Sequence, residues 1–263
     1  MSQPEIVRDA AATLYNAWMA GTRLSALPDA MRPATEEEGF AVQQAIAARS
    51  GSRRFGWKIA ATSLAGQKHI GVSGPLVGSI LESRVIPSGS PVPLAGMIMG
   101  VAEAEFAFRF GRPLLPRAKP YSVPEVLDAV ASLHPAIEIP DSRYSDFVTA
   151  GAPQLVADNA CACWFTLGPA TAIDWRKLDL STHAVTATVG GKVAGTGTGA
   201  NVLGDPRVAL AWLVNRLSGL GVAVCENEVV TTGTCVVPVD IKPGDSLVVD
   251  FGVIGTHEAR FTA

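Results

Sequence analysis

The hydrophobic positions of the first fifty residues recur with the period of an α-helix. Between Ile6 and Trp18 the apolar residues fall at i, i+3, i+4 and i+7, and Gly21 offers a helix stop. A second helix is expected from the capping-box pattern Thr-Glu-Glu-Glu, which begins at Thr35, to about Gly51. The N-terminal part is therefore predicted to be helical.

From Phe55 onward the pattern changes to short apolar runs between turn residues, which is typical of β-strands. The run from Val185 to Ala194 is interrupted by Gly190-Gly191 and predicts a tight β-hairpin. Another strand is expected from Ser246 to Val253, directly after a Lys-Pro-Gly-Asp turn.

Two segments within this strand-rich part keep the helical period. Ser122 to Glu125 forms a second capping box, and the apolar residues that follow it predict a helix as far as Leu133. Asp205-Pro206 combines a helix cap with proline at the first helical position, and Gly219 marks the expected end of that helix.

The whole pattern predicts an α+β architecture. A small helical subdomain is expected at residues 1–52, and a larger mixed β domain with a few covering helices at residues 53–263. Of the 263 residues, 48% are hydrophobic and 17% are charged. This low charged fraction favours surface buried between subunits, so we expect a homo-oligomer.

Charge and composition exclude several classes of partner. No apolar run approaches the ~20 residues that cross a bilayer, so no membrane association is expected. Charges occupy the N-terminus where a signal peptide is apolar, which predicts a cytoplasmic protein. The net charge of −3 gives no electrostatic case for nucleic acid.

The four cysteines are expected to be free, with Cys161 and Cys163 as small buried residues in an extended segment.

Two acidic residues share one face of a predicted strand. In the segment from Val101 to Phe110, Glu103 and Glu105 alternate with alanine and phenylalanine. Two carboxylates at i and i+2 on a strand stand about 6–7 Å apart at their bases and can lean onto one ion. A half-buried strand with a solvated acidic face is the alternative interpretation.

A third acid and one lysine are isolated in apolar runs. Glu138 lies between Ile137 and Ile139, where it either faces water or points inward and needs a partner. Lys58 lies in the run from Trp57 to Ala61, where it either extends its tip to solvent or supplies positive charge and a proton near a metal. Three glutamates without a histidine or thiolate cluster suit Mg²⁺ or Mn²⁺ rather than zinc.

Six short motifs, taken in order, resemble the fumarylacetoacetate hydrolase superfamily over nearly the whole chain. They are K-I-x-x-T-S-x-x-x-Q (Lys58 to Gln67), E-x-E-x-A-F (Glu103 to Phe108), I-E-x-x-D-S-R (Ile137 to Arg143), A-D-N-A (Ala157 to Ala160), G-D-P (Gly204 to Pro206) and T-T-G-T (Thr231 to Thr234). The branch resembled contains the 2-oxo-pent-4-enoate hydratases and 4-oxalocrotonate decarboxylases of aromatic degradation. The resemblance implies a mixed β-roll or sandwich with a small helical N-terminal part.

The resemblance also implies roles for individual residues. It places one divalent cation, Mg²⁺ or Mn²⁺, on Glu103, Glu105 and Glu138, and it makes Lys58 a catalytic residue beside the substrate. It places Ser63, Gln67 and Asp158 at the substrate pocket, although a structural role for Asp158 stays open. One position departs from the family: its hydratases carry an acid directly after the proline of the G-V-x-x-P segment, where this chain has Leu76.

We therefore expect a metal-dependent lyase that acts on short 2-oxo or 2-hydroxy-dienoic acids, foremost as a 2-oxo-pent-4-enoate hydratase. A decarboxylase of the 4-oxalocrotonate type is the first alternative, because Leu76 cannot shuttle a proton for water addition. An acylpyruvate C–C hydrolase is another alternative, for which His69 and Glu82 are the candidate base pair. A non-catalytic metal-bound partner subunit is the last.

Overall fold

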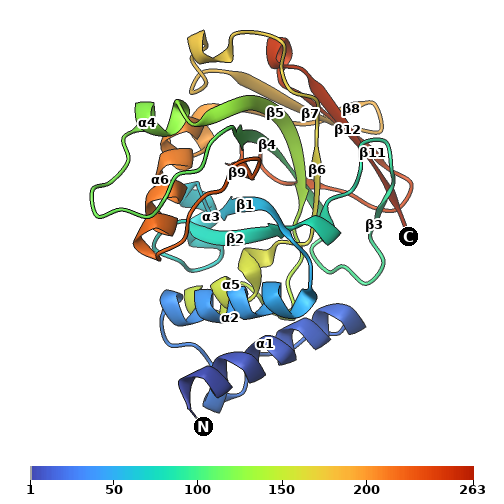
Figure 1. The fold of residues 1–263 in the computed structure, drawn as a ribbon. Coiled ribbons are helices and arrows are strands. Elements are labelled where there is room, and N and C mark those ends of the chain that lie inside the picture. Colours follow the sequence, from blue (N-terminus) through green and yellow to red (C-terminus); the bar gives the residue numbers. More distant parts are fainter. Residues whose placement is uncertain (1) are drawn as a thin grey trace.

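The computed structural model describes residues 2–263, and Met1 lies outside the described residues. Two helices open the chain, and strands with a few interspersed helices follow (Figure 1). The helices are α1 (Gln3–Ala20), α2 (Glu36–Ser50), α3 (Leu64–His69), α4 (Val123–Leu127), α5 (Ala152–Ala157) and α6 (Pro206–Gly219). The strands are β1 (Arg54–Ala60), β2 (Leu76–Leu81), β3 (Val92–Pro93), β4 (Val101–Phe110), β5 (Val130–Ile139), β6 (Trp164–Leu167), β7 (Ala184–Val189), β8 (Lys192–Thr198), β9 (Val229–Thr234), β10 (Val239–Asp240), β11 (Ser246–Asp250) and β12 (Thr256–Thr262).

The strands form two mixed sheets. The seven-stranded sheet has the order β2-β1-β9-β4-β5-β6, with β10 beside β4, and the five-stranded sheet has the order β3-β12-β11-β7-β8. Only β1–β9 and β12–β3 are parallel pairs among the described strands. The larger sheet curls, because Val85, just after β2, pairs with Phe165 of β6 and brings its two edges together. The predicted hairpin is confirmed as β7 and β8.

The two N-terminal helices lie across one end of the molecule, below the larger sheet in Figure 1. Both end where the sequence predicts, at Gly21 and Gly51, which adopt left-handed backbone conformations. The Thr35 hydroxyl accepts the N–H of Glu38 and caps α2. The apolar core of these helices includes Tyr144 and Ala157 from the strand-rich part. A domain boundary between residues 52 and 53 stays a prediction.

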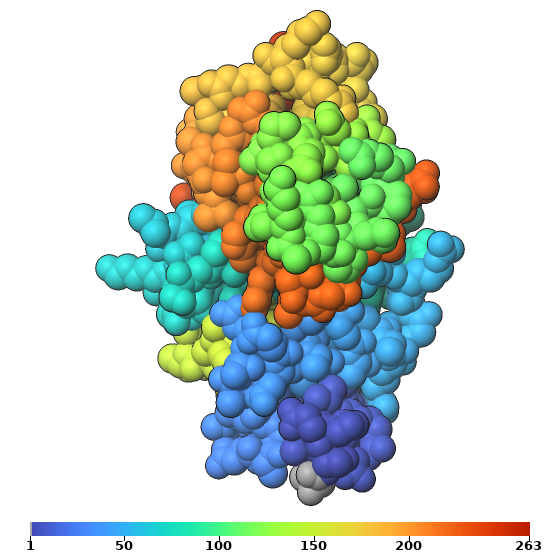
Figure 2. All heavy atoms as spheres, turned by 60° about the vertical axis from the view of Figure 1, so that its left-hand side comes forward, coloured from blue at the N-terminus to red at the C-terminus, as the bar shows by residue number. Residues whose placement is uncertain are grey.

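Helix α6 covers one side of the larger sheet. Figure 2 shows the segment before β5 lying beside α6 on this face. The side chain of Asn215 joins them, because its Oδ1 accepts the N–H of Tyr121 and its Nδ2 donates to the Tyr121 carbonyl. The α+β class and the covering helices are thus confirmed. No helix among residues 2–263 is both long and apolar enough to cross a membrane.

Three local predictions are wrong. The helix expected to reach Leu133 ends at Leu127, because the chain from Val130 onward is drawn into β5 between β4 and β6. The strand expected to reach Val253 ends at Asp250, where the chain turns to start β12. Cys161 lies in a short turn with φ of 61° instead of in an extended segment.

Candidate metal centre

Strand β4 presents its two glutamates on one face and its aromatic residues on the other. The Phe106 ring packs edge-on against Phe251, which directly follows β11 of the smaller sheet, with 4.9 Å between centroids. The Phe108 ring packs in the same manner against Trp175. Because alternate strand residues point to opposite faces, this aromatic packing fixes Glu103 and Glu105 on the inner face of the curled sheet. The predicted alternation is therefore present.

Strand β5 brings the third glutamate to the same place. β4 and β5 are antiparallel, and their register sets Glu138 directly opposite Glu103. One carboxylate oxygen from each of Glu103, Glu105 and Glu138 lies within 4.8 Å of the other two. Glu105 and Glu138 are buried, whereas Glu103 is half-buried. The inward orientation of Glu138 is thus the one the fold adopts.

The carboxylates are short of hydrogen-bond donors. Oε2 of Glu105 accepts bonds from the Thr231 hydroxyl and from the Gly233 N–H, the latter at 2.8 Å. Oε1 of Glu105 and Oε2 of Glu138 are buried without a hydrogen-bond partner within residues 2–263. Buried polar oxygens normally have partners, so each of these calls for one. Thr231 and Gly233 belong to the T-T-G-T motif, but the sequence alone did not assign them to the site.

Burial raises the pKa of all three acids, and repulsion by Glu138 adds to it at Glu103 and Glu105. Burial, reinforced by the charge of Glu138, raises the pKa of Glu103 to about 7. The pKa of Glu105 and that of Glu138 are also raised, chiefly by burial. Charged carboxylates in such a place need compensating positive charge. A divalent cation would supply it, and three carboxylate oxygens without nitrogen or sulfur are a donor set for a hard cation. The residues present fit such an ion.

Lys58 supplies the positive charge within the cluster. The residue is only 2% exposed, so the interpretation of a lysine tip reaching solvent is wrong. Nζ lies 3.0 Å from Oε1 of Glu138 and donates to the Ala160 carbonyl at 2.9 Å. Burial alone would lower the pKa of Lys58, but the three carboxylates outweigh it and raise that pKa. Lys58 is therefore held as an ammonium ion.

The orientation of Lys58 follows from its neighbour in β1. The Trp57 ring stacks on Phe40 of α2, with 6.2 Å between centroids, and its Nε1 donates to Glu228. The guanidinium of Arg54 covers the same indole ring at 4.2 Å. Trp57 is thereby fixed on the outer face, which puts Lys58 on the inner face with the glutamates.

The three residues expected at the substrate pocket have local structural partners. The Ser63 hydroxyl caps α3 by accepting the N–H of Gly66, and the Gln67 amide donates to the Ala61 carbonyl. Asp158 is completely buried and receives hydrogen bonds from Ser142. The structure does not bring any of these side chains into hydrogen-bond contact with the glutamates within residues 2–263.

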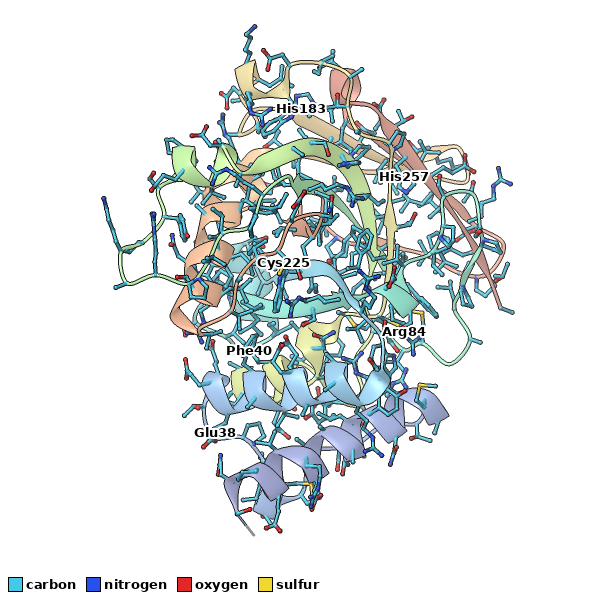
Figure 3. All side chains as sticks on the ribbon, in the orientation of Figure 1. Glu38, Phe40, Arg84, His183, Cys225 and His257 are labelled. Carbon is cyan, nitrogen blue, oxygen red and sulfur yellow. The ribbon has the colours of Figure 1, made fainter. Side chains whose placement is uncertain are left out.

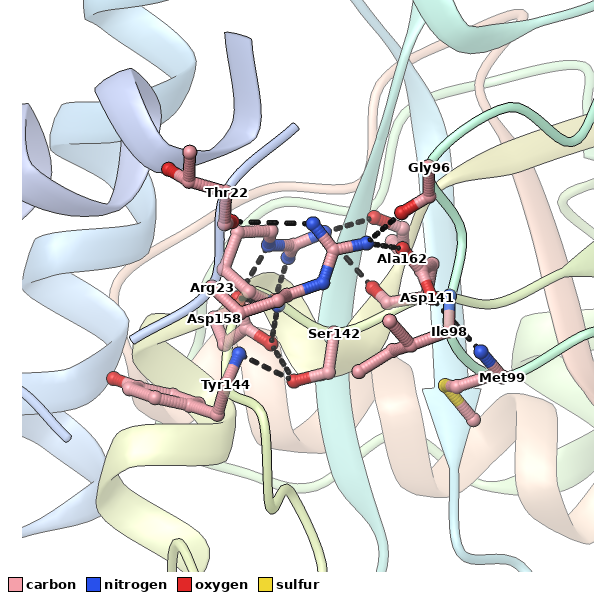
Figure 4. Close-up of polar contacts among 11 residues, drawn as sticks. Thr22, Arg23, Gly96, Ile98, Met99, Asp141, Ser142, Tyr144, Asp158 and Ala162 are labelled. Atoms are coloured by element: carbon pink, nitrogen blue, oxygen red, sulfur yellow. Dashed lines mark hydrogen bonds and ion pairs between the residues drawn. The ribbon is translucent and has the colours of Figure 1, made fainter. Parts of the chain in front are cut away.

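Asp158 belongs to a buried polar network beside the site. Its carboxylate pairs with the Arg143 guanidinium and accepts the Ser142 hydroxyl at 2.7 Å. Figure 4 shows Asp158 and Ser142 close to a second ion pair, between Arg23 and Asp141. Because Asp141 to Arg143 follow the end of β5, the network braces the chain just beyond Glu138.

The histidines of the chain lie outside the carboxylate cluster. His69 is exposed at the end of α3, and His134 bonds the Gly168 carbonyl. Figure 3 shows His183 and His257 in the upper part of the molecule, with the five-stranded sheet. Within residues 2–263, no hydrogen bond or ion pair joins His69 to the exposed Glu82, the pair weighed for a C–C hydrolase.

Comparison with known proteins identifies the family. The family model described as "Fumarylacetoacetate (FAA) hydrolase C-terminal" matches residues 69–262. The chain belongs to the fumarylacetoacetate hydrolase family. Within this family, it is 33% identical to a 2-keto-4-pentenoate hydratase of Burkholderia vietnamiensis over 265 residues, covering 100% of both chains. It is 30% identical to a 4-oxalocrotonate decarboxylase of Pseudomonas putida, covering 86% of each chain.

A solved structure of a family member shares the fold. The 4-oxalocrotonate decarboxylase from Pseudomonas putida G7, complexed with magnesium and adipate, superposes with a TM-score of 0.88. The match covers 99% of this chain and 98% of the other at 27% identity. The fumarylacetoacetate hydrolase type of fold, with its N-terminal helices, is thus confirmed for this chain.

Proposed function

We propose that this fumarylacetoacetate hydrolase family member is a divalent-metal-dependent hydratase of 2-hydroxypenta-2,4-dienoate, the enol form of 2-oxo-pent-4-enoate. The observation that carries the proposal is the cluster of three inward-facing carboxylates with the buried Lys58 ammonium. The full-length similarity to a 2-keto-4-pentenoate hydratase supports this choice of substrate.

Glu103, Glu105 and Glu138 would hold the cation, which we propose to be Mg²⁺ or Mn²⁺. The three carboxylates exceed the single ammonium by two negative charges, which one dication balances. Magnesium in the similar decarboxylase structure is consistent with this choice. When bound, the ion would supply Lewis acidity that stabilises negative charge on the 2-oxygen of the substrate.

Lys58 would hold and move a proton at Nζ. The Nζ carries three N–H bonds, of which the structure directs one to Glu138 and one to Ala160. The third N–H bond is left to face a bound 2-oxo acid substrate. A fixed ammonium in a dry site stabilises an oxyanion more strongly than one in water, because no solvent has to reorganise around it.

The reaction balances as a proton shift followed by addition of water. The dienol loses its O–H proton and gains a proton at C5, which leaves a 2-oxo acid with a double bond between C3 and C4. Water then adds its oxygen to C4 and a proton arrives at C3. The product is 4-hydroxy-2-oxopentanoate, and no oxidant or reductant is needed. Lys58 is the proton carrier that the cluster offers for these steps.

A second candidate activity is decarboxylation of 4-oxalocrotonate. It is favoured by Leu76, which stands in β2 opposite Ala60 and is only 1% exposed in the main apolar core. A hydrocarbon side chain there cannot deliver a proton or activate water. Loss of carbon dioxide needs no water nucleophile, so this activity would tolerate Leu76 better than hydration does.

One panel of assays separates these activities. The purified protein with Mg²⁺ or Mn²⁺ is mixed with freshly generated 2-hydroxypenta-2,4-dienoate, with 4-oxalocrotonate and with an acylpyruvate. The proposal expects metal-dependent loss of dienoate absorbance and formation of 4-hydroxy-2-oxopentanoate. Carbon dioxide release from 4-oxalocrotonate without dienoate turnover would assign the decarboxylase instead, and cleavage of the acylpyruvate would assign a hydrolase.

We further propose a cytoplasmic homo-oligomer that acts on a small 2-oxo acid. The 17% charged fraction supports assembly, as do well-exposed valines such as Val237 and Val193. Burying such residues against another subunit removes apolar area from water.

A further inference from the structure

Three consecutive residues beside Lys58 have left-handed backbone conformations. Asn159, Ala160 and Cys161 have φ angles of 57°, 49° and 61°. None of them is glycine. Asparagine tolerates this conformation, but at Ala160 and Cys161 it is unfavourable and must be imposed by the surroundings. The central carbonyl, that of Ala160, accepts the Nζ–H of Lys58 at 2.9 Å. The carbonyl at the centre of the strained turn therefore binds Nζ of Lys58, the atom proposed to move protons.

Asn159 fixes the turn to the edge of the larger sheet. Its side-chain Oδ1 accepts the backbone N–H of Ser79 at 2.6 Å, and its Nδ2 donates to the Ser79 carbonyl at 2.7 Å. The amide thus pairs with strand β2 as a neighbouring strand would. Because Asn159 is buried, water does not compete for these two bonds.

Because Gly78 has no side chain, the turn and the stem of Lys58 can pack closely against it. A Cβ atom at this position would lie 2.6 Å from the Asn159 carbonyl oxygen. It would also lie 2.8 and 2.9 Å from Cδ and Cγ of Lys58. Since the first of these contacts is with backbone, a side chain at residue 78 would displace both the turn and the lysine stem.

Arg143 holds the turn from its two ends. Its Nη2 donates to the Asp158 carbonyl just before the turn, and its Nη1 donates to the Ala162 carbonyl just after it, the latter at 2.9 Å. These contacts stabilise the segment as a whole but do not set its distance from β2. Among the hydrogen bonds of residues 2–263, only those of the Asn159 amide tie the turn directly to β2, the antiparallel neighbour of β1.

We propose that Asn159 is a positioning residue for Lys58. By fixing the left-handed turn on β2, it sets the Ala160 carbonyl at the point where that oxygen aims the ammonium at Glu138 and the substrate. The inference rests on the catalytic role of Lys58 proposed above. It goes further, because it assigns a function to Asn159. Within residues 2–263, this side chain forms no hydrogen bond with the three glutamates.

The test is a double-mutant cycle between Asn159→Gly and Lys58→Met. Glycine adopts positive φ without strain, so Asn159→Gly removes the tie to β2 and spares the turn. For the Mg²⁺-loaded enzyme with freshly generated 2-hydroxypenta-2,4-dienoate, we expect kcat to fall about 10- to 10²-fold, since a shift of ~1 Å can cost about 10²-fold. KM and Mg²⁺ affinity should change little. In the Lys58→Met background, the same substitution should cause no further loss.

A second variant reaches the same contact by a different route. Gly78→Ala should displace the lysine stem and lower kcat, and again should add nothing in the Lys58→Met background. Gly219→Ala at the end of α6 is the matched control, because a Cβ there meets no atom within 4 Å. It should leave kcat at the wild-type value. A cooperative unfolding transition shows that Asn159→Gly is folded. If that transition is absent, the kcat of Gly78→Ala in the two backgrounds tests the proposal instead.

Two results would overturn the inference, and they are distinguishable. Equal losses of kcat in the wild-type and Lys58→Met backgrounds would mean that Asn159 supports the fold without acting through Lys58. Normal turnover by the single Lys58→Met variant would remove the catalytic role of Lys58 itself, and the positioning role with it.

Discussion

Glu103 and Glu138 are direct cross-strand neighbours on β4 and β5 and face the interior of the same curled sheet. Like charges directly opposite one another on a sheet are destabilising, and burial strengthens their repulsion. Lys58 offsets the charge of one carboxylate through its contact with Glu138. The remaining negative charge destabilises the fold, and a bound dication would relieve this cost.

Glu105→Gln should abolish tight binding of Mg²⁺ or Mn²⁺ and activity together. The glutamine oxygen can still accept the bonds from Thr231 and Gly233, so the fold should be kept. Isothermal titration calorimetry and the dienoate assay measure the two effects. The exposed Glu226→Gln is the matched control and should behave as wild type. A Glu105→Gln protein that kept both properties would show that the site is assigned wrongly.

Metal affinity should rise with pH between about 6 and 8. Burial and the charge of Glu138 raise the pKa of Glu103 to about 7, so below that pH this carboxyl is largely protonated and cannot bind a cation. Calorimetric titration with Mg²⁺ at several pH values should show tighter binding and fewer released protons at higher pH. An affinity independent of pH across this range would contradict the prediction.

Lys58→Met should lower kcat by roughly 10²-fold or more, as expected for loss of a positioned acid–base group. The methionine keeps much of the bulk of the lysine stem, so folding of the metal-bound protein should survive. Mg²⁺ binding should be retained, because the three glutamates are intact. Steady-state kinetics with calorimetry measures both effects, and normal turnover would remove Lys58 from the mechanism.

Asp158→Asn should destabilise the fold by about 3–5 kcal/mol, because it leaves the buried Arg143 guanidinium without a charged partner. Urea unfolding of the Mg²⁺-loaded protein gives this value. Asp174→Asn, which breaks an exposed pair with Lys177, should leave the free energy of unfolding nearly unchanged. If Asp158→Asn raised KM strongly at unchanged stability, Asp158 would contact substrate.

The protein should assemble in solution into a homo-oligomer. Multi-angle light scattering at micromolar concentration should give a particle of at least twice the 27.3 kDa of one chain. Replacing the exposed Val237 by lysine should weaken the assembly if this face is covered. A particle of 27.3 kDa under these conditions would contradict the prediction.

Much of the local structure could be predicted from the sequence, since it depends on near neighbours. The caps at Thr35 and Asp205 and the glycine stops are set by hydrogen bonds and φ angles within a few residues. The alternation in β4 likewise predicts, from the sequence alone, that Glu103 and Glu105 share one face. The isolated Glu138 left a solvent-facing and an inward carboxylate both open, and its sequence did not show which strand it would face.

Tertiary structure decided the rest, because it depends on contacts between distant parts of the chain. Val130 and Leu133 fit a helical period, yet both pair with β4, and this tertiary pairing overrides the local preference. The direction of Lys58 follows from Trp57 packing on α2. The left-handed turn at Asn159 is held by hydrogen bonds to Ser79 of β2 and to Arg143. The sequence does not signal such a turn, because the free-energy cost of its strained backbone is offset by hydrogen bonds to a residue about eighty positions away.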